Sequence, residues 1–568
     1  MGPAESIEIV RRMRAVRVPH PRALAPVALV AVLSVLLVGG TATTPAALAG
    51  RPIAVAARSA SALGPARIPT RARIAAHAHT AASHGPTVTA ALASLRRSGA
   101  ITPAVYQKDY AAYLAAVNSL KKLGGTRRNE LGAVVANVRA IAAAGGFIPS
   151  RLGALFLTLE RNRTWWTSGS LLASRVRISF PGSELVWEYY AGQGIEIQWL
   201  GTFGEGNGYY SGGQNNNLKQ LVSELIPLAT ARAGGIAWEY MFQFDGGKPP
   251  WTSGLSQGTA LQVLSRDYSR FKEPAVLKAA QEALGIFKTP PPSGVRVASS
   301  FGAHYLEYTY APTDRILNGE LQALVGLYDY TSLTKDPAGL ALFEAGDAEE
   351  RVRTPLYNTG YWSMYDQYGE SDLNYHELLT EFLQHLCERT RKGEPLATTP
   401  APAPAPATPT TPTTPTTPPA GGTPGGTTGT GGTTGGASAA RYTARAASTT
   451  TTPATAQIAG DQIYCTTAEA FTADEHTPPK IALLTTKLPT SARAGVQLSL
   501  SKVATVHLTV RLGGTVVYSN SATVERGKPK LLWPTPSKGG SYTVTLTATD
   551  LAGNFATASG TITVAKGA

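Results

Sequence analysis

Aromatic, hydroxyl and amide side chains are concentrated in three segments that each precede or open a predicted helix. These segments are residues 249–258, 304–319 and 355–376. Loops carry binding and catalytic residues more often than core elements do. Aromatic rings can stack on the apolar faces of sugars, and neighbouring polar groups can bond the hydroxyls. The three segments therefore predict a carbohydrate site.

The same segments resemble the C-terminal domain of D-glucuronyl C5-epimerases, enzymes of heparan-type polysaccharides. Six blocks occur in the family's order: Trp-x-Ser-x-x-x-Gln-Gly at 251–258, Glu-Tyr ahead of Leu-Asn-Gly at 307–319, Leu-x-Gly-Leu-Tyr-Asp at 324–329, Pro-Leu-Tyr-x-Thr-Gly at 355–360, Tyr-Asp at 365–366 and Tyr-His at 375–376. The resemblance covers residues 180–391 well and does not extend to the C-terminal third of the chain.

The resemblance implies an isomerase that inverts C5 of a uronic acid inside a polymer. The proton at C5 is removed from one face of the sugar and replaced from the other. Such a site must neutralise the carboxylate, stabilise the enolate-like intermediate and hold an acid or base on each face. Phenols with a lowered pKa or carboxylates with a raised pKa can do this near neutral pH.

The resemblance also carries four catalytic residues over to this chain. We expect Glu307 and Tyr375 to be the acid and base on opposite faces, and Tyr308 and Tyr365 to bind the substrate or share a proton relay. The predicted substrate-binding residues are Trp251, Gln257, Asn318, Tyr357, Tyr368 and His376. The alternative for each aromatic residue is packing in a helical core.

One position departs from the family's pattern. The family has an arginine that contacts the uronate carboxylate three positions after the equivalent of Tyr365, and Tyr368 stands there in this chain. Arg315, Arg353 and Lys248 are nearby cations that could replace it. Two alternatives stay open: a polysaccharide lyase, which begins with the same proton abstraction and could use the same residues, and a glycan-binding protein without catalytic activity, which Tyr368 in place of the arginine would suit.

The elements that must position these residues are mostly helices. Apolar periodicity predicts helices over 105–123, 127–144, 150–161, 218–233, 258–269, 273–287, 317–332, 336–354 and 374–390. Alternating residues predict a small antiparallel β element over 175–180, 183–190 and 194–200, and the glycine-rich run 204–208 is interpreted as a turn between strands. Helical hairpins in series favour a mainly α, α/α-toroid-like domain over residues 86–395.

The C-terminal third has a different composition. Residues 396–455 are rich in Thr, Pro and Gly and predict a linker. Short alternating strands predict an immunoglobulin-like β sandwich over 478–568. We expect this sandwich to bind a cell-surface or glycan target. Cys387 and Cys465 flank the linker, and both a disulfide bond and two free thiols are consistent with the sequence.

The N-terminus predicts export. Basic residues precede an apolar run at 24–38 and the sequence Ala47-Leu48-Ala49. This order indicates a signal peptide over residues 1–49, cleaved after Ala49, with an uncleaved membrane anchor as the alternative. Residues 50–85 predict a disordered basic spacer. The chain is expected to be secreted or held at the cell surface.

The net charge and the absence of certain motifs limit which classes of partner and cofactor are expected. The net charge is +14, of which residues 1–85 contribute +8 and the remainder +6, a balance that suits a polyanionic partner such as an acidic polysaccharide. No nucleic-acid-binding motif occurs, and the short motifs HExxH, CxxC and GxSxG are absent, so neither a cofactor nor a metal is expected. The family resemblance implies a homodimer.

Overall fold

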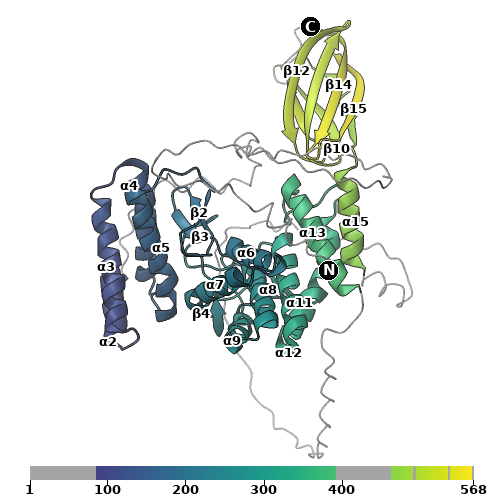
Figure 1. Ribbon diagram of the computed structural model, residues 1–568. Helices are drawn as coiled ribbons and strands as arrows, with labels where there is room; N and C mark the ends of the chain where they lie inside the picture. Colours follow the sequence, from purple (N-terminus) through teal and green to yellow (C-terminus); the bar gives the residue numbers. More distant parts are fainter. Residues whose placement is uncertain (1–84, 392–461, 490–493, 535–537, 566–568) are drawn as a thin grey trace, which may run out of the picture.

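The computed structural model describes residues 85–391, 462–489, 494–534 and 538–565 (Figure 1). The predicted signal peptide, almost all of the basic spacer and the Thr/Pro/Gly linker lie outside these ranges. The predicted fold class is confirmed: a helix-rich part carries small antiparallel sheets, and an all-β part follows it. None of the described helices has the length and apolarity needed to cross a bilayer.

Four helices form the first layer, on the left of Figure 1: α2 (Val88–Arg97), α3 (Pro103–Leu120), α4 (Gly125–Ala143) and α5 (Pro149–Ser168). The hydroxyls of Thr87 and Thr102 accept hydrogen bonds from the first turns of α2 and α3. Pro103 and Pro149 begin α3 and α5, where a missing backbone N–H costs nothing. Local capping chemistry therefore sets where these helices begin.

A three-stranded antiparallel sheet packs beside α5 and contains β1 (Arg177–Ile178), β2 (Trp187–Tyr190) and β3 (Gly194–Ile197). Asn162 of α5 bonds both backbone groups of Ile195, donating to its carbonyl at 2.6 Å and accepting from its N–H at 2.8 Å. This buried amide fixes the sheet against the first helical layer.

The glycine-rich run at 204–208 is not a turn. It lies inside α6 (Trp199–Ser211), so the expectation of a strand to residue 200 and a connecting turn is wrong. Glycine lowers helix propensity, but a Cβ at Gly206 would lie 2.8 Å from Leu221 and 2.9 Å from Val263. Close packing between helices selects glycine here and overrides local propensity.

The central helices are α7 (Asn215–Leu225), α8 (Gly254–Phe271), α9 (Pro274–Ala283), α10 (Gly285–Lys288), α11 (Leu317–Thr334), α12 (Pro337–Arg353) and α13 (Leu373–Thr390), with 3-10 turns η1 (Ile226–Leu228) and η2 (Thr354–Tyr357). Two hairpins lie among them: β4 (Thr230–Arg232) with β5 (Gly235–Ala237), and β6 (Arg296–Ala298) with β7 (Ala303–Tyr305). The helix predicted over 218–233 ends at Leu225, because Pro227 lies in the 3-10 turn that leads into β4.

Helices α8 and α11 form the centre of the core. A Cβ at Gly258 would lie 2.7 Å from the Cα atom of Ala323, and a Cβ at Gly326 would lie 2.0 Å from the carbonyl of Gly258. The two backbones therefore touch, and larger residues would force them apart. This contact holds the first turns of α8 and α11 in a constant relation to each other.

The C-terminal part is a β sandwich. It contains β8 (Ile481–Leu483), β9 (Lys487–Leu488), β10 (Ala494–Leu500), β11 (Ala504–Leu512), β12 (Thr515–Val524), β13 (Lys530–Trp533), β14 (Gly540–Asp550) and β15 (Phe555–Val564). One sheet has the order β13-β10-β8 and the other β12-β11-β14-β15-β9. Alternate residues of β11 and β14 are buried between the sheets, as the period-2 pattern predicts.

A helix that the sequence pattern did not reveal joins the two parts. Helix α15 (Ile463–Glu475) packs along α13, and a disulfide bond links Cys387 of α13 to Cys465 of α15. The segments on either side of the linker are thus bonded to each other. The linker is not what sets the distance between the helical part and the sandwich.

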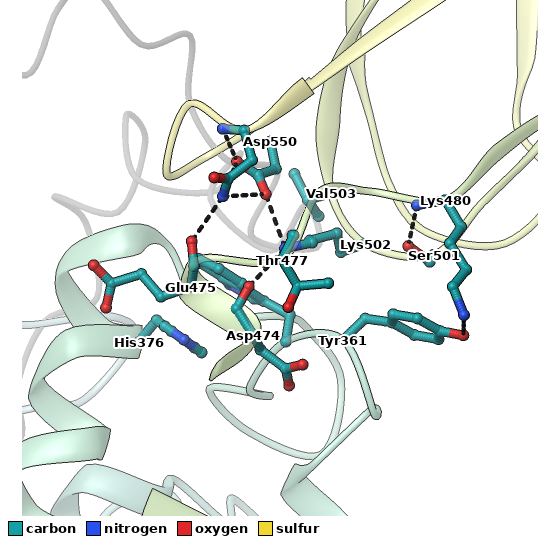
Figure 2. Close-up of polar contacts among 12 residues, drawn as sticks. Tyr361, His376, Asp474, Glu475, Thr477, Lys480, Ser501, Lys502, Val503 and Asp550 are labelled. Atoms are coloured by element: carbon teal, nitrogen blue, oxygen red, sulfur yellow. Dashed lines mark hydrogen bonds and ion pairs between the residues drawn. The ribbon is translucent and has the colours of Figure 1, made fainter. Parts of the chain in front are cut away.

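The sandwich rests on the end of α15 through a buried lysine (Figure 2). The Lys502 ammonium is 1% exposed and lies 2.8 Å from the Asp550 carboxylate. It also donates to the backbone carbonyls of Asp474, at 2.8 Å, and Thr477, at 2.5 Å. A cation at these carbonyls compensates the negative end of the helix dipole. Lys502 therefore connects the sandwich with the helical part.

Candidate active site

A cavity of about 530 Å³ opens between α6, α8, α11, α13 and the strand β2. Five of the ten predicted site residues line it: Trp251, Glu307, Tyr308, Asn318 and Tyr375. They come from three segments that are far apart in sequence. The α8–α11 contact and the packing of α13 on α11 bring these segments to one cavity.

Glu307 is the buried carboxyl group of this cavity. Its side chain accepts hydrogen bonds from Tyr308 and Asn318, whereas Oε2 has no partner. Burial raises the pKa of Glu307 to about 7, although the two hydrogen bonds oppose this rise. A Cβ at Gly319 would lie 2.7 Å from the Cβ of Glu307, so glycine at this position leaves room for the carboxyl group. Glu307 can exchange a proton near neutral pH.

Three tyrosines are close enough to Glu307 for its charge to affect their pKa. Burial and the charge of Glu307 raise the pKa of Tyr308, Tyr365 and Tyr375 above the ordinary phenol value. Of the two kinds of catalytic group considered from the sequence, phenols with a lowered pKa are therefore not found among these three tyrosines. Neutral phenols are proton donors, so they complement a carboxylate that acts as a base.

Tyr365 reaches the cavity through Tyr375. The two rings lie with centroids 4.6 Å apart, and their side chains are hydrogen-bonded. Only Tyr375 lines the cavity itself. The backbone around Tyr365 is fixed from both sides, because its carbonyl accepts from Leu317 N–H at 3.1 Å and its N–H donates to Gly369 at 2.9 Å. The pair is suited to pass a proton from one phenol to the other.

Trp251 and Asn318 both line the cavity, and each is held in place by contacts within the protein. The Trp251 ring stacks on Tyr240 at 4.3 Å and meets Tyr308 edge-on at 5.7 Å, and its Nε1 donates to the carbonyl of Phe242. Because Trp251 is 4% exposed, it forms a wall rather than a free platform. Asn318, in the first turn of α11, holds the Glu307 carboxyl group.

Three predicted substrate-binding residues point elsewhere. Gln257 is fully buried and bonds both backbone groups of Trp238. The hydroxyl of Tyr357 donates to the carbonyl of Arg315 at 2.8 Å. Tyr368 is 67% exposed, in a turn that the Asp366 carboxylate closes by accepting two backbone N–H groups. None of the three lines the cavity, because Gln257 and Tyr357 are buried by packing and the turn leaves the Tyr368 side chain in solvent.

His376 is also outside the cavity. Burial lowers the pKa of its imidazole to about 4, so the ring is neutral. Its Nε2–H donates to the carbonyl of Phe471 in α15 at 2.9 Å, and Nδ1 therefore accepts from the Ser363 hydroxyl at 2.8 Å. The ring stacks on Trp362 at 3.7 Å. Both nitrogens are occupied, so His376 positions the loop that precedes α13 and does not meet a substrate.

The cation that best faces a substrate is one that sequence reasoning missed. Arg315, Arg353 and Lys248 do not line the cavity, whereas Arg175, Arg266 and Arg389 do. The latter two are bound to the Asp329 carboxylate at 3.1 and 2.8 Å.

Arg175 is 61% exposed in its side chain and pairs with Glu188 at 3.1 Å. Its guanidinium lies over the Tyr190 ring at 4.7 Å, and its charge lowers the pKa of Tyr375 against the effect of burial. Arg175 therefore places a positive charge at the mouth of the cavity, near the phenol pair. In the sequence Arg175 begins the predicted strand 175–180, a pattern that gives no sign of the cavity.

Comparison with known proteins agrees with this geometry. Residues 233–398 match the family described as D-glucuronyl C5-epimerase C-terminus, and residues 492–565 match the bacterial Ig-like domain. A D-glucuronyl C5-epimerase of Caenorhabditis elegans is 34% identical over 131 residues, which cover 21% of this chain and 21% of that protein. An uncharacterized protein of Methanocaldococcus jannaschii is 26% identical over 151 residues, 25% of this chain and 49% of that protein.

The chain thus spans between about a fifth and a half of the length of these two relatives. The matched region contains Trp251, Glu307, Tyr308, Asn318 and Tyr375, and it excludes Arg175. Residues 233–398 are thus similar to the D-glucuronyl C5-epimerase C-terminus family, and residues 492–565 are similar to the bacterial Ig-like domain.

Proposed function

We propose that this protein is a uronosyl C5-epimerase that acts on a uronate-containing polysaccharide. The observation that supports the proposal most directly is Glu307: a buried carboxyl group with a pKa of about 7, in a cavity that it shares with Tyr308 and Tyr375. A group with this pKa is half ionised near neutral pH, as a general base requires.

In the proposed reaction the Glu307 carboxylate removes the proton from C5. The electron pair of the C–H bond moves toward the uronate carboxylate and gives an enolate-like intermediate. The hydroxyl of Tyr375 then protonates C5 from the other face. Tyr365 returns a proton to Tyr375 through the hydrogen bond between them, and solvent exchange resets Glu307 and Tyr365.

Arg175 takes the role of the arginine that position 368 lacks. Its guanidinium can bind the uronate carboxylate and stabilise the charge that develops there, which makes the C5 proton more acidic. Tyr308 and Asn318 keep the Glu307 carboxyl group oriented through their hydrogen bonds. The catalytic roles of Glu307, Tyr308, Tyr365 and Tyr375 are part of this proposal.

The cavity favours a polymer that enters from solution over a small soluble metabolite, because it is open and lined by aromatic rings and arginines. We propose that the protein meets this polymer outside the cell, as the predicted signal peptide implies. The Ig-like domain would then help to retain the enzyme near its substrate. A homodimer, as in the resembled family, is part of the same proposal.

The decisive experiment is incubation of the full chain with acidic polysaccharides in deuterated water. We expect deuterium at C5 of the uronate, measured by NMR after depolymerisation, and a change in configuration at that carbon. Glu307→Gln and Tyr375→Phe should abolish the exchange, whereas Tyr106→Phe, a change on helix α3, should not. Absence of exchange with every uronate polymer tested would refute the proposal.

The same incubation separates the alternatives. A lyase would generate the ultraviolet absorbance of an unsaturated uronate and shorten the polymer. A binding protein without activity would retain polysaccharide on an affinity column and give neither signal. Either outcome would leave the site's geometry intact and change the reaction assigned to it.

A further inference from the structure

A second group of functional side chains lies behind the proposed active site. His304 of β7, Glu320 of α11 and Glu350 of α12 each turn a ligand atom toward the others, and these atoms lie within 4.8 Å of one another. All three residues are at most 2% exposed. None of them lines the cavity that contains Glu307.

The polar atoms of this group are poorly satisfied by the protein. Both ring nitrogens of His304 and the Oε1 atom of Glu320 are buried without a hydrogen-bond partner. The Nδ1 atom of His304 lies 3.0 Å from Oε2 of Glu320, but that oxygen is directed at the N–H of Tyr305. Buried polar atoms without partners cost free energy, and a bound ion is one of the ordinary explanations for them.

The charges around the group leave room for a cation. Glu349 also faces it, but this carboxylate is already bound by Arg353 and the hydroxyl of Ser299. Arg315 and Arg353 are the cations whose charges act on Glu320. With all groups ionised, the carboxylates of Glu320, Glu349 and Glu350 outnumber these two guanidiniums by one.

We propose that His304, Glu320 and Glu350 bind a divalent transition-metal ion of the Zn²⁺ type. One imidazole nitrogen and two carboxylate oxygens are a ligand set that Zn²⁺ accepts, with a fourth position left for another donor. Ca²⁺ prefers six or more oxygens and does not suit a site with a buried imidazole. Its members are 16 and 30 residues apart and lie on three elements, so no short sequence motif contains them.

The ion would join β7, α11 and α12, and each of its ligands is close in sequence to a segment of the proposed active site. His304 lies three residues before Glu307, and Glu320 lies two residues after Asn318. Glu350 precedes the 3-10 turn that leads to the loop of Tyr365. The metal would therefore hold the catalytic segments together from behind without touching the substrate.

The test is the metal content of the full chain, purified after expression with added zinc and measured by mass spectrometry. We expect about one zinc ion per chain and a lower Tm after treatment with a chelator, restored by Zn²⁺ but not by Ca²⁺. Glu350→Gln and His304→Gln should each lose the ion. Glu196→Gln, which alters a buried glutamate of β3 outside the group, should retain it.

Wild-type protein reconstituted with Co²⁺ gives a readout that does not depend on the variants' folding. Visible absorption bands of protein-bound Co²⁺ are expected at one equivalent and should be removed by competing Zn²⁺. A wild-type chain that holds neither zinc nor cobalt, or variants that retain the ion, would overturn the inference. Either result would leave the C5-exchange experiment unaffected, because no proposed step of that reaction uses the metal.

Discussion

Glu307 derives its proposed role from its surroundings. An exposed glutamate is ionised at pH 7 and is too weak a base to share a proton usefully there. Burial in the cavity raises the pKa of Glu307 to about 7, and the N–H of Asn318 and the hydroxyl of Tyr308 keep the carboxyl group in place. The three neighbouring phenols remain protonated because the same environment raises their pKa. The same buried environment thus leaves Glu307 able to lose its proton near pH 7 while the phenols keep theirs.

The raised pKa of Glu307 predicts a pH dependence with a definite sign. The folded protein binds this proton more tightly than the unfolded chain, so the stabilisation that Glu307 contributes is fully present below pH 4.5 and is lost as the pH rises through about 7. The loss should be about 2–3 kcal/mol between pH 5 and pH 8 relative to Glu307→Gln, measured by urea unfolding of both proteins. Equal pH profiles for the two would contradict the assignment. The wild-type exchange rate should rise over the same range.

Arg175 is expected both to bind the uronate carboxylate and to stabilise the charge that develops on it during proton removal. Arg175→Met removes the charge proposed to hold the uronate carboxylate, which should lower kcat/KM by about 10- to 100-fold. Arg139→Met, which removes an arginine of α4 beside Tyr113, should leave kcat/KM unchanged. The comparison is made by the deuterium-exchange assay over a range of polymer concentrations. If both variants behave as the wild type, another cation neutralises the substrate.

The resemblance found the residues that belong to contiguous motifs and missed those that do not. Glu307, Tyr308 and Asn318 share one block, and the structure places all three at the cavity. Gln257 and His376 also lie in motif blocks, but they serve packing, which residue types alone do not distinguish from binding. Arg175 comes from a strand region some 130 residues before Glu307, where only the folded chain shows the proximity.

At the scale of elements, the sequence predicts most helices of the helical part from the spacing of apolar residues, and capping residues and prolines explain where several of them begin. Helix α2 and the hairpins β4–β5 and β6–β7 were not predicted, and two further helices, α6 and α15, depend on distant contacts. Helix α6 depends on the close approach of Leu221 and Val263 to Gly206, which no local pattern reveals. Helix α15 is short and follows a low-complexity segment, and its place is set by contacts with α13. Tertiary packing decides both elements.

The bond between α13 and α15 should be a large contribution to stability. Replacement of Cys387 and Cys465 by serine opens a loop with a sequence separation of 78 residues. In the chain-entropy description this lowers the free energy of unfolding by about 4–5 kcal/mol. Urea unfolding with and without reductant measures it: reductant should destabilise the wild type and leave the double variant unchanged. A wild type insensitive to reductant would contradict the expectation.

At the scale of the whole molecule, polar contacts join the base of the sandwich to the helical part. Glu370, in the loop of Tyr365, accepts from the backbone of Val503 at 2.8 Å and pairs with Arg526 at 3.0 Å. Lys502 lies 5.0 Å from the Trp362 ring, which stacks on His376 beside Tyr375. Contacts thus run from the Ig-like domain to the loop that holds the phenol pair.

Lys502→Met tests this connection. The change leaves the buried Asp550 carboxylate without its cation and removes the bonds to the end of α15, at a cost of about 3 kcal/mol. We expect the sandwich to unfold at a lower temperature than the helical part, which calorimetry would record as two transitions. Lys528→Met, a change of an exposed lysine in the same sandwich, should keep the wild-type profile. Identical profiles for both variants would show that Lys502 does not couple the two parts.

The disulfide between Cys387 and Cys465 has a consequence for processing. A protease that cuts anywhere between these residues breaks the backbone but does not separate the two products, because the sulfur–sulfur bond and the α13–α15 contact both survive. Such a nicked protein would migrate as one species until it is reduced and as two afterwards. If the protein is exported as proposed, it would therefore stay in one piece after a protease cuts the predicted linker.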